Sequence, residues 1–419
     1  MSKNGKYIVI SLLLSVIIIF FQFNQIPLQM APDEVEFTQL ALSLDEKPYQ
    51  TYSPIATGHA TLYFYIILAS FKLFGVSLLA LRLPAAIFGV INSILIYLIF
   101  DRIFKNKHIL AIPLSFVLTL AFITLRWHIN FSRFSFEATF LLFLELVSTL
   151  FIFLYFENKK MRWLVGSSIF AGLTFNSYTP GRVFFIIPLL LLLNIAKKAK
   201  IQRRVLNLTI YIIPFLVFAA PLILTFFQTQ DYRVNEEFIF NAKDLTSLQK
   251  YQGVISNLAS NTGMLFFKGD MNGRHNYPGK AALNPILFFF FLVGTWHFIK
   301  KRKQWYDYYF LLYFTVSFIP TIFSHPHGNP NMLRTFTVLP GIIYFIALGM
   351  EYFATLEVKK YKKYVTFAIL ILIVLSSLYE LRTYFVHQKR EMQYTFEIRK
   401  SFDWLKKRNF ILTPEAYQY

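Results

Sequence analysis

Two adjacent carboxylates follow the first membrane-length apolar run of the sequence. The run covers 7–26, and Pro32, Asp33 and Glu34 come where a membrane surface would lie. A partly dehydrated carboxylate beside basic groups is suited to remove a proton from a hydroxyl nucleophile. The same pair is equally suited to the first turn of a surface helix, where acidic side chains stabilise the helix N-terminus. Apolar residues at near-helical spacing predict such a helix over 33–44.

A second group of polar residues closes the loop 228–280. Its last part, 269–279, is rich in Gly, Asn and Pro, and the apolar run 281–299 begins directly behind it. This composition predicts a structured turn, and Arg274 with His275 at a membrane boundary is suited to bind a phosphate. The alternative is that Arg274 only extends to the lipid headgroups, as boundary arginines often do.

Two further arginines occur in similar surroundings. Arg182 follows a Ser-Tyr-Thr-Pro-Gly segment, and Arg334 follows a segment of His, Pro, Gly and Asn residues. One boundary arginine carries little information. Three arginines on one face, together with His59 and His275, predict a cradle for a phosphate group.

Other candidate residues are discounted. His325 and His327 stand two positions apart with no third ligand nearby, so we expect no metal site. The sequence contains no phosphate-binding P-loop and no dinucleotide fingerprint, and we expect no cofactor. Glu145 lies in the middle of an apolar run, where an ionisable group is either functional or paired inside the bundle. Its depth separates it from the surface residues above.

The composition defines the elements that must position these residues. Of the 419 residues, 56% are hydrophobic and only 15% are charged, which is more apolar surface than a soluble domain could bury. We therefore expect an all-α, polytopic membrane protein. The formal net charge of +20 does not indicate a nucleic-acid partner, because the basic residues stand in short runs between apolar segments. The absence of Cys excludes disulfides and thiol-ligated metals.

About eleven apolar runs are candidate transmembrane helices: 7–26, 83–100, 109–125, 138–156, 163–175, 183–196, 205–227, 281–299, 305–323, 335–356 and 364–381. A twelfth run, 62–74, is short and contains Lys72, so it either crosses or lies in the interface. If 62–74 does not cross, half of the 42 Lys and Arg residues fall into short segments on one face. The positive-inside rule makes that face cytoplasmic and favours the interfacial alternative.

This topology sends all the longer polar loops to the external face: 27–82, 126–137, 178–182, 228–280 and 324–334. Because loops on a rigid scaffold often carry function, we expect the active face to be external. Residues 1–381 form the predicted membrane domain. Residues 382–419 form a short external tail with eight basic residues, which fits the positive-inside rule poorly.

The order of these features resembles the GT-C superfamily, the integral-membrane glycosyltransferases that use polyprenyl-phosphate sugars. This superfamily contains the dolichyl-phosphate-mannose protein mannosyltransferases of glycosyltransferase family 39 and the bacterial aminoarabinose transferases that modify lipid A. The resemblance covers residues 1 to about 356. Its motifs are Pro32-Asp33-Glu34, Gly58-His59-Ala60-Thr61-Leu62-Tyr63, Phe74-Gly75, Leu81-Arg82-Leu83-Pro84, Gly269-Asp270, Arg274-His275-Asn276, and Arg334 with Val338-Leu339-Pro340.

The resemblance implies roles for individual residues. Asp33 would be the catalytic base, Glu34 would position the acceptor, and 62–74 would form a juxtamembrane helix. The lipid phosphate would be held by His59, Arg182, Arg274, His275 and Arg334.

The chain departs from the pattern in two places. Gly58-His59 stands where the aminoarabinose transferases typically carry a Glu-Lys pair. Members also often continue into a soluble external domain, which is either missing here or vestigial in the tail 382–419.

The implied activity is the transfer of a sugar, with inversion, from a polyprenyl phosphate to a hydroxyl of a protein, lipid or glycan. Arginines would take the place of a metal in neutralising the leaving phosphate. We expect a multi-pass protein of a bacterial plasma membrane. The rival is a transporter or lipid flippase, which would carry its functional residues near the bilayer midplane. A non-catalytic scaffold would leave Asp33 replaceable.

Overall fold

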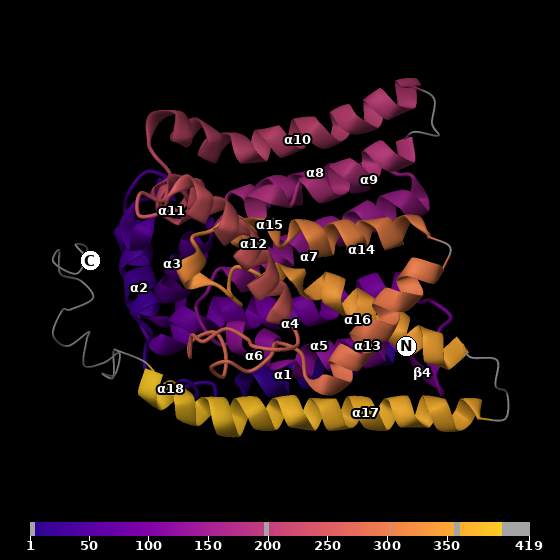
Figure 1. Ribbon diagram of the computed structural model, residues 1–419. Coiled ribbons are helices and arrows are strands. Elements are labelled where there is room, and N and C mark those ends of the chain that lie inside the picture. The colour runs from indigo at the N-terminus through magenta and orange to yellow at the C-terminus, as the bar shows by residue number, and fades with distance from the viewer. Residues whose placement is uncertain (1–4, 197–200, 302, 356–360, 396–419) are drawn as a thin grey trace.

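The computed structural model describes residues 5–196, 201–301, 303–355 and 361–395. Most of these residues form a bundle of helices that run along one common direction (Figure 1). The bundle helices are α1 (Gly5–Phe20), α4 (Leu78–Ile103), α5 (Leu114–Thr124), α7 (Ala138–Asn158), α8 (Met161–Phe175), α9 (Ile186–Ala196), α10 (Ile201–Gln228), α13 (Pro285–Lys300), α14 (Trp305–Val316), α16 (Leu339–Thr355) and α17 (Lys362–Arg382).

The predicted all-α class is confirmed, and each predicted apolar run overlaps one bundle helix. Within the described residues, 5 helices are long and apolar enough to cross a membrane by length and composition. Several of the other bundle helices are apolar but shorter, so the count of eleven stays a prediction. The strands of the described part form two short antiparallel hairpins, β1 (Tyr52–Ser53) with β2 (His59–Ala60) and β3 (His108–Ile109) with β4 (Ile112–Pro113).

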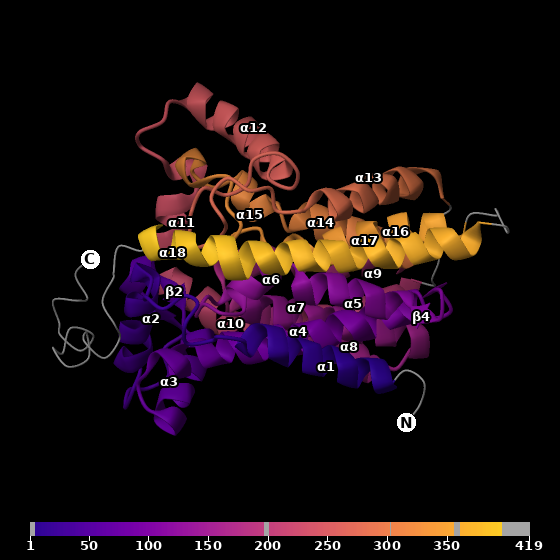
Figure 2. The same cartoon turned by 90° about the horizontal axis from the view of Figure 1, so that it is seen from below.

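Short elements connect the bundle helices. They are α2 (Pro32–Ser43), η1 (Ile55–Thr57), α3 (Leu62–Phe74), α6 (Arg126–Phe131), η2 (Thr179–Val183), α11 (Tyr232–Glu237), η3 (Ile239–Asn241), α12 (Ser247–Gly263), α15 (Ile319–Ile322), η4 (Pro326–Gly328), η5 (Phe336–Val338), η6 (Thr383–Gln388) and α18 (Lys389–Thr395). Figures 1 and 2 show α2, α3 and α11 at one end of the bundle, whereas the β3–β4 hairpin lies at the opposite end.

Helix α3 covers the ambiguous run 62–74 and lies beside α2, at the end of the bundle (Figure 2). Its last residues, Leu73 and Phe74, are exposed, while Lys72 forms an ion pair of 2.5 Å with Asp45. An apolar, exposed helix end in this position suits the membrane interface. The position agrees with the interfacial alternative.

Close packing of α13 on α16 depends on two glycines. A Cβ atom at Gly294 would lie 1.7 Å from the carbonyl oxygen of Phe345, and one at Gly349 would lie 2.0 Å from that of Phe290. Small residues allow helix backbones to approach closely, which is a common way to pack helices inside membranes.

Two further sequence predictions concern Glu145 and the tail 382–419. Glu145 on α7 is buried and accepts a hydrogen bond of 2.5 Å from the Tyr313 hydroxyl on α14, so it is paired within the bundle. The chain continues from α17 through η6 into α18. The rest of the predicted tail, 396–419, lies outside the described residues.

Candidate functional site

A cleft of roughly 330 Å³ opens at the end of the bundle that carries α2 and α11. Its lining includes residues from all five loops that the topology assigned to one face, among them Asp33, Glu137, Tyr178, Arg274 and Arg334. These residues lie up to about 300 positions apart in the chain, so the bundle has brought together the polar loops of one end.

Helix α2 carries Asp33 to the edge of the cleft. Pro32 occupies the first helical turn, and the apolar face behind it packs into the core through Val35, Phe37 and Leu40. The helix predicted over 33–44 is therefore confirmed as α2. The Asp33 carboxylate remains 31% exposed, and its Oδ2 accepts a hydrogen bond of 2.6 Å from Arg274 Nη1.

Glu34 points the other way, into the protein. Its side chain is fully buried, and both carboxylate oxygens accept hydrogen bonds of 2.7 Å from Arg82 of α4. Oε2 also accepts the backbone N–H of Ala31 at 3.1 Å. Glu34 does not line the cleft, and its buried pair with Arg82 gives no support to the contact with an acceptor that the resemblance implies. Consecutive helical residues point in different directions, and the i+1 neighbour of Asp33 faces the core.

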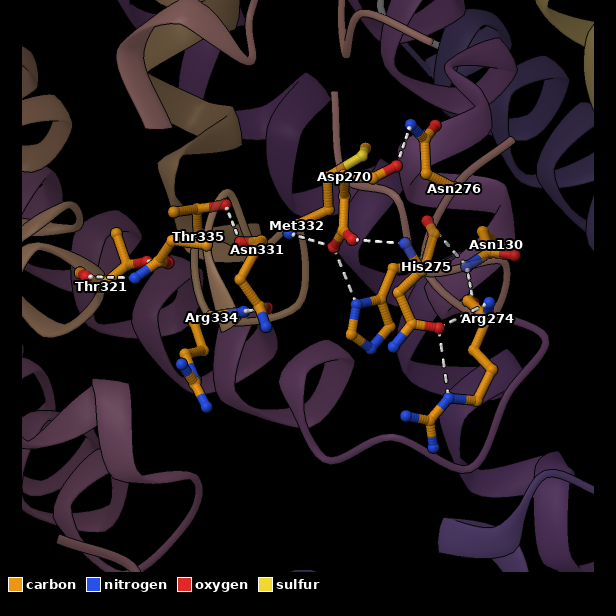
Figure 3. A network of polar contacts seen from close by, with 12 residues as sticks. Asn130, Asp270, Arg274, His275, Asn276, Thr321, Asn331, Met332, Arg334 and Thr335 are labelled. Carbon is orange, nitrogen blue, oxygen red and sulfur yellow. Dashed lines mark hydrogen bonds and ion pairs between the residues drawn. The ribbon is translucent and has the colours of Figure 1, made fainter. Parts of the chain in front are cut away.

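Asp270 organises the loop that carries Arg274 and His275 (Figure 3). Its Oδ2 accepts hydrogen bonds of 2.8 Å from His275 Nδ1 and from the Met332 N–H, so it joins two loops. Because Nδ1 donates to Asp270, Nε2 is the remaining polar atom of the ring, and the imidazole lines the cleft. In Figure 3 the side chains of Arg334, His275 and Arg274 extend toward the same side.

Helix α6 donates side-chain hydrogen bonds to both of the loops that Asp270 joins. Trp127 Nε1 donates to the Met332 carbonyl at 2.9 Å, and Asn130 Nδ2 donates to the Arg274 carbonyl at 2.8 Å. Arg126 is buried and pairs with Glu380 at 2.9 Å. Sequence reasoning missed this support, although the concentration of Arg, Trp, His and Asn in one short loop was a visible signal.

Arg334 and Arg233 complete the basic lining. Arg334 Nη2 pairs with Glu237 at 2.9 Å, and Arg233 Nη1 lies 3.7 Å from Glu137 Oε1. Burial opposes the charge of Arg233, but Glu237 and Glu137 more than offset this and raise its pKa. Sequence reasoning missed Arg233, because Gln228–Phe238 contains no motif that separates it from an ordinary loop arginine.

His59 and Arg182 were predicted to bind the phosphate, yet neither lines the cleft. His59 is buried behind two cleft residues, Arg233 and Glu137. Its Nε2 accepts a hydrogen bond from Arg233 at 3.0 Å, and its Nδ1 donates to Glu137 at 3.0 Å. Arg182 forms an ion pair with Asp231 and covers the ring of Phe226. These contacts assign His59 to the support of Arg233. Arg182 is held by its own carboxylate partner outside the cleft.

Glu36 is a cleft residue that sequence reasoning missed. It stands three positions after Asp33, and residues at this spacing share one face of a helix. Its carboxylate forms no ion pair or hydrogen bond with the described residues. Burial, reinforced by the negative charge of Asp33, raises the pKa of Glu36, and Arg233 and Arg274 act in the opposite direction.

The described residues contain no group of three or more His, Asp or Glu side chains arranged to hold a metal ion. His325 pairs with Asp244 at 3.1 Å, and its Nδ1 accepts the backbone N–H of His327. The polar side chains that line the cleft are carboxylates, guanidinium groups and one imidazole, together with the hydroxyls of Thr57 and Tyr178 and the amides of Asn272 and Asn331. Such a set can remove a proton and neutralise a phosphate.

Comparisons with known proteins find one family model that matches part of the sequence and two kinds of solved structure with a similar fold. Residues 58–224 match the family model described as dolichyl-phosphate-mannose-protein mannosyltransferase. Among curated proteins, none matches the sequence.

Two kinds of solved structure share the fold. The oligosaccharyltransferase of Archaeoglobus fulgidus, in its apo form, matches with a TM-score of 0.61 and 12% identity over 100% of this chain. This chain spans only 59% of the length of that enzyme. ArnT from Cupriavidus metallidurans, bound to undecaprenyl phosphate, matches with a TM-score of 0.56 and 12% identity. That match covers 94% of this chain and 77% of ArnT.

Proposed function

We propose that this chain is a membrane glycosyltransferase that transfers a sugar from a polyprenyl phosphate to a hydroxyl acceptor at the described cleft. The family match over 58–224 and the fold shared with the oligosaccharyltransferase and ArnT support this proposal. One observation carries the proposal. A solvent-accessible carboxylate, Asp33, lies 2.6 Å from Arg274 in a cleft that Arg334 and His275 also line. A base and a phosphate site therefore meet in one place.

The donor phosphate would bind between Arg274, His275 and Arg334. Arg274 is partly exposed and binds Asp33 through a single nitrogen, so it can turn its planar fork to a phosphate. Arg334 has the same freedom toward Glu237. His275 is held by Asp270 and presents Nε2 as a further donor when the ring is protonated.

In the reaction the acceptor oxygen attacks the anomeric carbon, and the bond from that carbon to the phosphate oxygen breaks. The acceptor proton passes to Asp33, and the electron pair of the broken bond leaves with the polyprenyl phosphate. Attack opposite to the leaving group inverts the anomeric centre. Negative charge grows on the leaving phosphate, where the guanidinium groups stabilise it most in the transition state.

The direct test incubates the purified chain with a panel of polyprenyl-phosphate sugars and hydroxyl acceptors and measures released polyprenyl phosphate. We expect release with at least one donor, together with a new glycoside of inverted configuration. Movement of an intact lipid-linked sugar across a vesicle membrane, without bond cleavage, would favour the transporter instead.

Replacement of Arg334 by Lys tests the phosphate site. The charge remains but the planar fork is lost, so we expect kcat to fall about tenfold, about 1.4 kcal/mol, with a smaller change in donor affinity. The matched control is Arg102→Lys, since Arg102 pairs with Glu157 and does not line the cleft. Full turnover in the Arg334 variant would assign Arg334 to anchoring at the membrane surface.

The proposed external position of the cleft has its own test. The chain has no native Cys, so single Cys replacements can be labelled without background. We expect Met271→Cys and Leu248→Cys, both at exposed positions, to react with an impermeant thiol reagent added to intact cells. Asn106→Cys, exposed beside the β3–β4 hairpin, should react only after the cells are opened. The reverse pattern would place the cleft in the cytoplasm.

A further inference from the structure

The charges around the cleft do not balance. The carboxylates of Asp33, Glu36, Glu137 and Glu237 face the guanidinium groups of Arg233, Arg274 and Arg334. Each guanidinium already has one carboxylate partner. Protonation of His275 would be matched by Asp270, which accepts from its ring. Glu36 is therefore the carboxylate of the lining that remains without a partner.

The charge of Glu36 suits the acceptor side of the cleft better than the donor side. A bound phosphate repels carboxylates and is attracted to the arginines, so an unpaired carboxylate is unsuited to the donor side. Positions three apart on a helix have neighbouring side chains, which puts Glu36 beside Asp33. An acceptor whose hydroxyl contacts Asp33 would thus have its neighbouring groups within reach of Glu36.

We propose that Glu36 binds the acceptor, and that its uncompensated charge selects acceptors with a cationic or uncharged group, and rejects anionic ones, beside the nucleophilic hydroxyl. This inference rests on the proposed transferase function. The role once expected of Glu34 then belongs to Glu36. Partial burial supports the selection, because a carboxylate shielded from water interacts more strongly with neighbouring charges.

Three acceptors with the same alkyl chain test the selection: a glucoside, a 2-amino-2-deoxyglucoside with an ammonium group, and a glucoside 6-phosphate. The purified full chain is given each acceptor with the donor that it cleaves best. We expect kcat/KM to be highest for the ammonium or neutral acceptor and at least about tenfold lower for the phosphate. Glu36→Gln should reduce the ammonium-to-phosphate ratio about tenfold, mainly through the KM of the acceptor.

Two further variants make the result specific. Glu36→Asp keeps the charge and should keep most of the preference, which a merely structural role would not explain. Glu46→Gln, an exposed glutamate of the same loop, is the matched control and should behave as the wild type. Donor affinity should be unchanged in all three variants, because Glu36 contacts the other substrate.

The possible failures are distinguishable. No release of polyprenyl phosphate by the wild type with any donor and acceptor would overturn the proposed function itself. Release with an unchanged acceptor ranking in Glu36→Gln would overturn only the role of Glu36. A wild type that prefers the phosphate acceptor, or that cleaves its donor but uses none of the three acceptors, would also overturn it.

Discussion

Asp33→Asn is expected to reduce sugar transfer by roughly 10² to 10⁴, the usual contribution of a general base. The substitution keeps the shape of the side chain and removes its ability to take the acceptor proton. It also removes the carboxylate that holds Arg274, so donor affinity should stay equal or increase. The measurement is released polyprenyl phosphate under saturating donor and acceptor, with donor binding determined separately.

Asp45→Asn is the matched control for this prediction. Asp45 lies in the same loop, pairs with Lys72 at the surface, and does not line the cleft. Its replacement should leave turnover near the wild-type value. Retention of more than about a tenth of the activity by Asp33→Asn would contradict the role of Asp33 as the base.

The contact between Asp33 and Arg274 links donor binding to the base. In the structure Arg274 Nη1 donates to the Asp33 carboxylate, the group that we propose to accept the proton. A phosphate that draws Arg274 away would free Asp33 Oδ2 for the hydroxyl of the acceptor. The same arginine would then serve both substrates in sequence.

Sequence reasoning was most successful where a feature repeats along the chain. Apolar runs of membrane length predicted the bundle helices, because length and hydropathy are properties of a whole segment. The positive-inside rule grouped the polar loops, and the structure brings Asp33, Arg274 and Arg334 from three of them into one cleft. The roles of these residues stay proposals.

It was least successful in assigning single side chains. Asp33 and Glu34 are chemically alike and adjacent, but one faces the cleft and the other is buried against Arg82. Only the helical phase of α2 against its neighbours distinguishes them. The i, i+3 spacing of Asp33 and Glu36 is the sequence signal that puts these two carboxylates on one face of α2. Arg233 carried no motif, and its ion-pair partner, Glu137, comes from a distant part of the chain.

The buried pair of Arg82 and Glu34 suggests how Asp33 is held in place. Arg82 also donates to the backbone carbonyls of Pro27 and Gln29, at 2.5 and 2.9 Å, so it ties the segment before α2 to α4. Both side chains of the pair are essentially inaccessible to solvent. Removal of either side chain of the pair would therefore leave the other charge buried without compensation. It would also loosen the start of α2, the helix that carries Asp33.

Arg82→Met is expected to lower the free energy of unfolding by about 3–5 kcal/mol, the usual cost of removing one partner of a buried ion pair. Addition of Glu34→Gln should restore part of this stability, because the uncompensated carboxylate is then gone. The measurement is the denaturation midpoint of the four members of this double-mutant cycle in one detergent, with transfer activity measured in parallel. Strong coupling between Arg82 and Glu34, in stability and in transfer activity together, would mean that Glu34 supports Asp33 by holding the start of α2 in place. A Glu34→Gln variant that keeps full stability but raises the acceptor KM would return Glu34 to the acceptor site.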